Sequence, residues 1–185
     1  MITPEQFKQK IHEKLRQLDT AKLIYPVATK VHADMTERLF GEGKDGTGGK
    51  IGNYSTEPMY AVKQQFKKQG AFRPRGKNSN KAKFANGNTR KSMYLAQGYK
   101  QLKQVQGYES GFVNLTYSSD LRNDFATKLA IQKDTVVCKL SRKINANKVA
   151  WLKAKYGGML WKHTEAERDF FVNEVTKKLI GYIEN

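Results

Sequence analysis

The strongest constraint on this chain is a stretch of 51 residues, Pro58 to Tyr108, that contains no aspartate or glutamate. The stretch carries 12 lysines and arginines, whereas the rest of the chain has 22 basic and 17 acidic residues. A net charge of +12, out of +17 for the whole chain, therefore lies in little more than a quarter of the sequence. Solvation of an ordinary surface does not require such a concentration. It predicts a polyanionic partner, either nucleic acid or an acidic protein surface.

Part of this stretch, residues 69–91, is rich in Gly, Pro, Asn, Ser, Lys and Arg and has no hydrophobic period. We call it the basic segment and predict a flexible loop, because it holds too few apolar side chains to order itself. Its two phenylalanines alternate with charges, as expected of a loop that follows phosphates or folds on a partner. A loop that is merely solvated is the alternative. The candidate residues for contact with a partner or DNA are Lys67, Lys68, Phe72, Arg73, Arg75, Lys77, Lys81, Lys83, Phe84, Arg90 and Lys91.

Length and composition predict one domain over residues 1–185, with the basic segment inside it. Leu, Ile, Val and Phe make up 40 of 185 residues, which predicts a folded chain with a thin core. The single cysteine, Cys138, excludes an internal disulfide and favours a reducing cytoplasm. The first residues lack the apolar core of a signal peptide, and no run reaches the roughly 18 apolar residues of a spanning helix. We therefore expect neither secretion by that route nor insertion into a membrane.

The N-terminal region has the pattern of a long amphipathic helix. Thr3, Pro4 and Gln6 form a helix start, and apolar residues recur three or four positions apart up to Phe40. Pro26 lies within this run and predicts two helices or one sharply kinked helix. Residues 41–49, of which five are glycine, predict a mobile turn or hinge.

The middle of the chain has weaker patterns. They predict a helix from residue 55 to 70 and another after residue 89, with Leu95, Tyr99 and Leu102 on one face. Alternation predicts strands at 112–117 and 135–140. Between these strands, a helix through Leu121 and Phe125 and a strand that begins at residue 119 fit about equally well.

The C-terminal region has the clearest element. We expect a helix at 146–156, a short extended run at 159–162, and a last helix that Thr164 and Glu167 start as a capping box. The fold class is therefore α+β. It consists of a long N-terminal helix or kinked helix pair, a small antiparallel sheet, a C-terminal helix packed on that sheet, and one long basic loop.

Motifs of catalysis and cofactor binding are missing or out of context. GEGKDG at 41–46 matches a dinucleotide-binding pattern, but a helix is expected before it where that site needs a strand. The three histidines have no metal-binding spacing, and no serine lies in a G-x-S-x-G turn. We expect no enzyme, no cofactor, no metal and no small-molecule substrate. An enzyme with scattered catalytic residues is the least favoured alternative.

Five short motifs follow one another between residues 54 and 157. They are Tyr54-Ser55-Thr56, Gly98-Tyr99, Leu115-Thr116, Ser118-Ser119-Asp120-Leu121 and Tyr156-Gly157, within YSTEP, RKSMYLAQGYKQLK, FVNLTYSSDLRNDF and AKYGGMLWKHTEAERDFF. In this order the chain resembles the phage virion-morphogenesis and tail-completion proteins of head–tail necks, over roughly residues 30–184. One departure is a turn that lacks its expected glycine, at Ser119-Asp120-Leu121.

The resemblance implies a structural, non-catalytic α+β subunit of a homo-oligomeric ring. Such a ring lies between portal or adaptor and tail tube in a virion assembled in the bacterial cytoplasm, and its lumen passes double-stranded DNA. The basic segment would then dock on an acidic portal or adaptor surface or line the DNA path. A cytoplasmic protein that binds nucleic acid nonspecifically through the same loop is the alternative.

Overall fold

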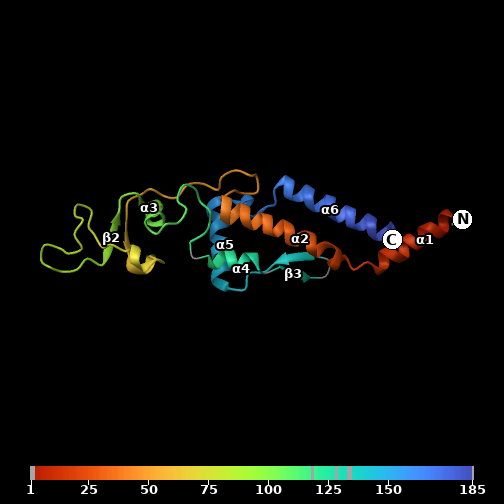
Figure 1. Cartoon of the computed structure of the whole chain (residues 1–185), viewed down its shortest axis with the longest axis horizontal. Coiled ribbons are helices and arrows are strands. Elements are labelled where there is room, and N and C mark those ends of the chain that lie inside the picture. The colour runs from red at the N-terminus through yellow and green to blue at the C-terminus, as the bar shows by residue number, and fades with distance from the viewer. Residues whose placement is uncertain (1–2, 118, 128, 133–134, 185) are drawn as a thin grey trace.

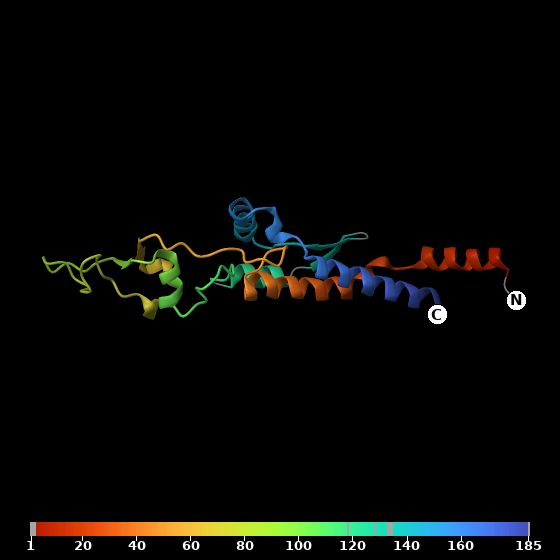
Figure 2. The ribbon, with the colours of Figure 1, turned by 90° about the horizontal axis from the view of Figure 1, so that it is seen from above.

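The computed structural model describes residues 3–117, 119–127, 129–132 and 135–184, and the fold is α+β as predicted. The molecule is elongated and has two lobes (Figures 1 and 2). The distal lobe contains β1 (Met59–Val62), β2 (Ser92–Leu95) and α3 (Gly98–Val105). The proximal lobe contains α2 (Thr20–Glu37), α4 (Asp120–Ala126), β3 (Leu129–Gln132), β4 (Thr135–Cys138), α5 (Lys143–Tyr156) and α6 (Glu165–Glu184). A further helix, α1 (Pro4–Gln17), precedes α2 and lies at the far end of the proximal lobe (Figure 1).

The N-terminal region forms two helices, but the break is not at Pro26. Thr3 and Gln6 cap α1 reciprocally, as predicted. The chain breaks at Leu18 and Asp19, because the Asp19 carboxylate accepts a hydrogen bond from the Lys22 amide (3.1 Å) and so starts a new helix. Pro26 lies inside α2, which continues through it. The position of the break was therefore predicted wrongly, while the helix pair is confirmed.

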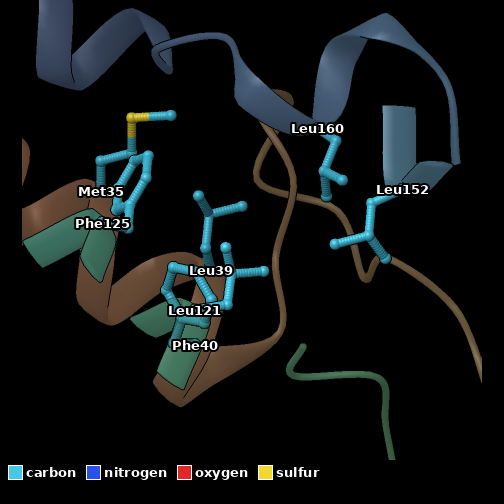
Figure 3. Packing of buried hydrophobic residues seen from close by; sticks show 7 residues of the cluster. All are labelled: Met35, Leu39, Phe40, Leu121, Phe125, Leu152 and Leu160. Carbon is cyan, nitrogen blue, oxygen red and sulfur yellow. The ribbon is translucent and has the colours of Figure 1, made fainter. Parts of the chain in front are cut away.

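The proximal core lies where α2 meets α4, α5 and the 3-10 helix Gly158–Trp161 (Figure 3). A π-helical turn, Arg38–Glu42, extends α2 and places two large apolar side chains in the core. The buried cluster consists of Met35, Leu39, Phe40, Leu121, Phe125, Leu152 and Leu160. The predicted extended run at 159–162 is wrong, since it falls in the 3-10 helix whose Leu160 completes this core.

Buried Arg38 joins three segments of the proximal lobe. Its guanidinium contacts the Glu167 carboxylate (2.8 Å) and donates to the carbonyls of Lys44 (3.1 Å) and Lys162 (2.9 Å). Glu167 also accepts from the Thr164 amide (2.8 Å), and the Thr164 hydroxyl accepts from the Glu167 amide (3.1 Å), which confirms the capping box. Burial alone would raise the pKa of Glu167, but these hydrogen bonds outweigh it and hold the pKa below its usual range.

The glycine-rich segment 41–49 forms a hydrogen-bonded turn. Asp45 donates its amide to the Gly49 carbonyl (2.8 Å) and accepts from the Gly48 amide (3.0 Å). Gly46 donates to the Met159 carbonyl (2.9 Å), and a side chain on Gly46 would lie 2.6 Å from the carbonyl oxygens of Met159 and Lys162. A helix precedes this turn, so it lacks the strand that a dinucleotide site requires.

Of the two alternatives for the segment after residue 119, the helix through Leu121 and Phe125 is confirmed as α4, and the strand that begins at residue 119 is wrong, since β3 begins only at Leu129. β3 pairs with β4 in an antiparallel hairpin, which confirms a strand within 135–140. The Asp124 carboxylate of α4 accepts hydrogen bonds from Ser141 (2.5 Å from its hydroxyl), from the Arg142 amide (3.2 Å) and from Asn145 (2.9 Å). These bonds, led by that from Ser141, lower the pKa of Asp124 and fix the start of α5.

The distal lobe differs most from prediction. The expected helix at 55–70 is wrong, because residues 59–62 pair as β1 with β2, with Ala61 opposite Met93. Burial of Ala61 between exposed Tyr60 and Val62 follows the two-residue period of a strand. The helix expected after residue 89 is replaced by β2 and the shorter α3. The strand expected at 112–117 is wrong as well, and Leu115 there has a φ of 52°.

The C-terminal helix packs chiefly on a helix. α6 lies along α2 in both views (Figures 1 and 2). The predicted packing on a sheet is therefore replaced, because each sheet has only two strands and cannot cover a helix of 20 residues. Among the described residues, no helix is long and apolar enough to cross a membrane.

We predict that Arg38→Met destabilises the protein by about 3 kcal/mol or more, because it leaves the Glu167 carboxylate buried without its cation. Chemical denaturation followed by circular dichroism measures the change. Arg122→Met is the matched control, since Arg122 pairs with Glu37 at 3.3 Å on the surface and its loss should cost less than about 1 kcal/mol. Equal effects of the two substitutions would contradict the prediction.

Candidate polyanion-binding surface

The acid-free stretch of the sequence coincides with the distal lobe. β1, β2, α3 and the segments between them all lie within residues 58–108. The lobe has its own small core of Ala61, Phe66, Met93, Leu95 and Leu102. In the described part of the chain, no ion pair of 4 Å or less involves a residue of this stretch. The charge segregation in the sequence is therefore also a segregation in space (Figure 1).

Tertiary contacts hold the base of the basic segment. Phe72 packs edge-on against Phe66, with ring centroids 5.2 Å apart. Arg75 pairs with β2, since its amide donates to the Ser92 carbonyl (3.1 Å) and its carbonyl accepts from the Tyr94 amide (2.9 Å). The Arg75 guanidinium also donates to the Tyr94 carbonyl (3.2 Å). Two predicted contact residues, Phe72 and Arg75, therefore serve largely to attach the segment to the lobe.

The tip of the segment is a cation–aromatic pair. The Arg90 guanidinium lies 4.1 Å from the centroid of the Phe84 ring, and Phe84 is 47% exposed. The same guanidinium covers Gly76, where an added side chain would lie 2.7 Å from it. The Arg90 amide donates to the Ala82 carbonyl (2.8 Å), so the two arms of the segment are joined at this point. Arg90 thus orders the segment and covers one face of the Phe84 ring, which stays about half exposed.

The remaining predicted residues form a solvent-facing basic surface. The Arg73 guanidinium donates to the Gly70 carbonyl (2.7 Å), and the Lys68 ammonium lies 5.0 Å from the centroid of the Tyr108 ring. The exposed basic residues are Lys67, Lys68, Arg73, Lys77, Lys81, Lys83 and Lys91. We call these seven residues the basic surface. They provide hydrogen-bond donors and positive charge that suit phosphates or carboxylates.

Sequence reasoning missed a buried lysine where the two lobes meet. Lys103 of α3 is 1% exposed, and its ammonium donates to the Thr116 carbonyl and to Asn114 (3.4 Å). It lies 4.7 Å from the ring centroid of Tyr54 and 5.6 Å from that of Tyr108. One of the 12 basic residues of the stretch is therefore buried and does not contribute to the basic surface. The i, i+4 spacing of Tyr99 and Lys103 on one helical face was the available signal.

Four tyrosines surround this position. Ring centroids are 5.5 Å apart for Tyr54 and Tyr99, 6.0 Å for Tyr99 and Tyr117, and 5.5 Å for Tyr108 and Tyr117. Burial raises the pKa of Tyr54 to about 12 and also raises that of Tyr99. Burial lowers the pKa of Lys103 to about 8, although Glu109 partly opposes this shift. The junction is thus a polar cluster packed by rings, and it fixes the distal lobe to the segment 108–117.

The chain matches no protein-family model, and no curated protein or solved structure is significantly similar to it. In the described ranges, no group of three or more His, Cys, Asp or Glu side chains is arranged to hold a metal ion. The candidate site is therefore argued only from the basic surface and from the residues of the distal lobe that hold it in place.

We predict that the stability of the lobe junction rises between pH 8 and about 10 because of Lys103. Its pKa of about 8 lies below the ordinary 10.5, so in this window the unfolded chain binds more protons and folding is favoured as pH increases. Lys103→Met should remove this rise, seen as a parent-minus-variant difference in near-ultraviolet melts that grows with pH. Lys63→Met, an exposed change in the same lobe, should not alter it. A difference independent of pH would contradict the assignment.

Proposed function

We propose that the chain is a structural, non-catalytic subunit of a tailed-phage virion, a neck or tail-completion ring subunit that joins portal or adaptor to tail. The observation that carries the proposal is the division of the molecule into a basic lobe without acidic residues and a helical lobe with exposed apolar side chains. The positive charge of the basic lobe suits a polyanion, and the exposed apolar side chains of the helical lobe suit contacts with other protein subunits. The motif order described above, from Tyr54-Ser55-Thr56 to Tyr156-Gly157, supports the same assignment.

The helical lobe supports association with other protein subunits. Phe7 of α1 is 57% exposed, and Val172 and Ile180 of α6 are 59% and 49% exposed. Single exposed apolar side chains are ordinary, but a group on two adjacent helices indicates an interface. The buried core is also small, with seven residues in the proximal cluster and five in the distal one. Burial against neighbouring subunits would add what these cores lack.

The basic lobe supports a polyanionic neighbour. In a ring between portal and tail, the distal lobes would meet DNA in the lumen or an acidic surface on the portal or adaptor. The elongated shape separates the two functions, since the basic surface lies at the opposite end of the molecule from α1 (Figures 1 and 2). A subunit of this form can bind its neighbours at one end and a polyanion at the other.

Fractionation of the native source tests the virion role. A lysate treated with nuclease is separated on a density gradient at about 0.5 M salt, where contacts made only to phosphates are largely screened. Mass spectrometry then locates the chain. We expect it with tailed, DNA-filled particles at several copies per particle. Recovery in the light soluble fractions alone would overturn the proposal.

A second candidate function is nonspecific binding of nucleic acid in the bacterial cytoplasm. The exposed Phe84 ring with Arg90 at 4.1 Å favours it, because an aromatic face beside a cation is a sequence-independent platform for stacking a base. Such a protein would bind DNA outside any particle and would release it as salt rises.

We predict that the basic surface sets the salt dependence of duplex-DNA binding. Lys77, Lys81 and Lys83 changed together to Gln should reduce the slope of log affinity against log salt by up to about 2.7, since each phosphate contact contributes about 0.9. Filter binding from about 50 to 200 mM salt measures it. The control changes Lys139, Lys143 and Lys178, exposed residues of the proximal lobe, to Gln and lowers the net charge equally. Equal slopes for the two triple variants would exclude the basic surface as the contact.

A further inference from the structure

Helix α1 makes few contacts with its own chain. None of its 14 residues is buried, and its apolar stripe leaves Phe7 57% and Leu15 41% exposed. Its C-terminal end is attached to α6, where Lys14 donates to the Ile183 carbonyl (2.9 Å) and Tyr182 donates to the Lys14 carbonyl (3.2 Å). The rest of α1 continues past the end of α6 (Figures 1 and 2). An isolated helix of this length is marginal in water, so α1 requires a partner for its stripe.

The proximal lobe has an apolar groove. We call this cavity of about 740 Å³, between α2, α6 and the β3–β4 hairpin, the lateral groove. Its walls include Ile24 and Ala28 of α2, Val136 of β4, and Phe171 and Val172 of α6. The exposed Cys138 of β4 also lines it. The lateral groove is thus the kind of surface that receives an amphipathic helix through residues at i, i+4 and i+8.

Charge favours α1 as the helix that fills a groove beside α6. α1 carries four basic and two acidic residues, a net charge of +2. α6 carries three basic and five acidic residues, a net charge of −2, in a chain whose total is +17. The two helices are therefore opposite in net charge over their whole lengths, while the charged α6 side chains in the groove wall itself are Arg168 and Glu167, which is paired with Arg38.

The connection between α1 and α2 favours docking on a second copy rather than on the same chain. Leu18 and Asp19 join the two helices, and both make capping hydrogen bonds. The Leu18 amide donates to the Leu15 carbonyl (3.4 Å), and the Asp19 carboxylate accepts from the Lys22 amide (3.1 Å). The two helices follow one another along the long axis of the molecule instead of lying side by side (Figures 1 and 2). The stripe of α1 therefore lies beyond the end of its own lateral groove.

We propose that α1 of one subunit docks in the lateral groove of a second copy of this chain, with Phe7 and Ile11 buried there. Stripe and groove are different surfaces of one molecule, so the contact is heterologous and repeats from subunit to subunit, giving a ring where the rotation closes. The inference rests on the proposed function in that it supplies the subunit contact of the proposed ring. Beyond the proposed function, the inference names the two surfaces in contact and states that α1 of one subunit binds the lateral groove of the next.

A cysteine on α1 tests the contact, because Cys138 already supplies a thiol in the groove. Lys8→Cys under mild oxidation should give a ladder of disulfide-linked species on a non-reducing gel. The ladder should be absent in Lys8→Cys with Cys138→Ser, and the parent should give none either. A monomer of altered mobility would show docking within one chain, and dimers that persist without Cys138 would show α1 pairing with α1. Either result, or no cross-link at all, would overturn the proposal.

The strength of the contact is tested separately by sedimentation velocity. Phe7→Asp should weaken self-association about ten- to a hundred-fold, as loss of one buried aromatic side chain predicts. Gln9→Asp, the same change of charge on a polar position of α1, should weaken it far less. Because α1 has no buried residue, neither change should alter the fold, which circular dichroism checks.

The outcomes separate the inference from the proposed function. Association that is unaffected by Phe7→Asp would overturn the docking of α1 and leave a ring built through other surfaces. A parent protein that stays monomeric at all concentrations would overturn the docking as well, whereas the virion role would still be decided by fractionation with particles.

Discussion

The proximal lobe depends on the buried guanidinium of Arg38. It is 7% exposed, and it holds the end of α2, the glycine-rich turn and the start of α6 together through Glu167 and the carbonyls of Lys44 and Lys162. A buried charge is tolerated only when its hydrogen bonds are satisfied, so the positions of these three segments are coupled. The π-helical turn that begins at Arg38 and brings Leu39 and Phe40 into the core belongs to the same arrangement. The lateral groove beside α6 exists because this network sets where α6 begins.

The distal lobe follows from a different constraint, the absence of carboxylates. Without acidic residues, cations in the lobe have only carbonyls and aromatic rings as local partners. Arg73 and Arg75 accordingly bond to carbonyls, and Arg90 lies on Phe84. Because these partners are uncharged, the lobe keeps its net positive charge while it remains folded, and the proposed binding of a polyanion depends on that charge. Lys103 has partners of the same kinds, two tyrosine rings and a backbone carbonyl, but it differs from the other cations in being buried, where the lobe joins the rest of the molecule.

Local signals predicted the ends of the chain, and tertiary contacts decided its middle. The capping boxes at Thr3 and Thr164 were readable because the hydrogen bonds of a helix and its cap lie within one short segment. β1 and β2 were not readable, since four residues with a single buried alanine gain their structure only by pairing with each other. Seven of the predicted contact residues, such as Lys77, are exposed, and their contact with a partner stays a prediction. Phe72 and Arg75 attach the basic segment to the distal lobe. Lys103 is buried beside Tyr54, which lies 49 residues earlier in the chain. No local sequence pattern identifies contacts between residues so far apart.

In the proposed ring, the arrangement of the two lobes would couple the association of subunits to the binding of a polyanion. Free subunits carry a net charge of +17 and repel one another, so complementary helices such as α1 and α6 must act at short range, where the local charges have opposite sign. The charge that opposes association is concentrated in the distal lobe, at the end of the molecule farthest from α1 (Figure 1). In the proposed assembly, a polyanion bound there would neutralise the repulsion without touching the helical contacts that we propose between subunits. Binding of the polyanion and association of subunits should therefore reinforce each other, although the surfaces that perform them are separate.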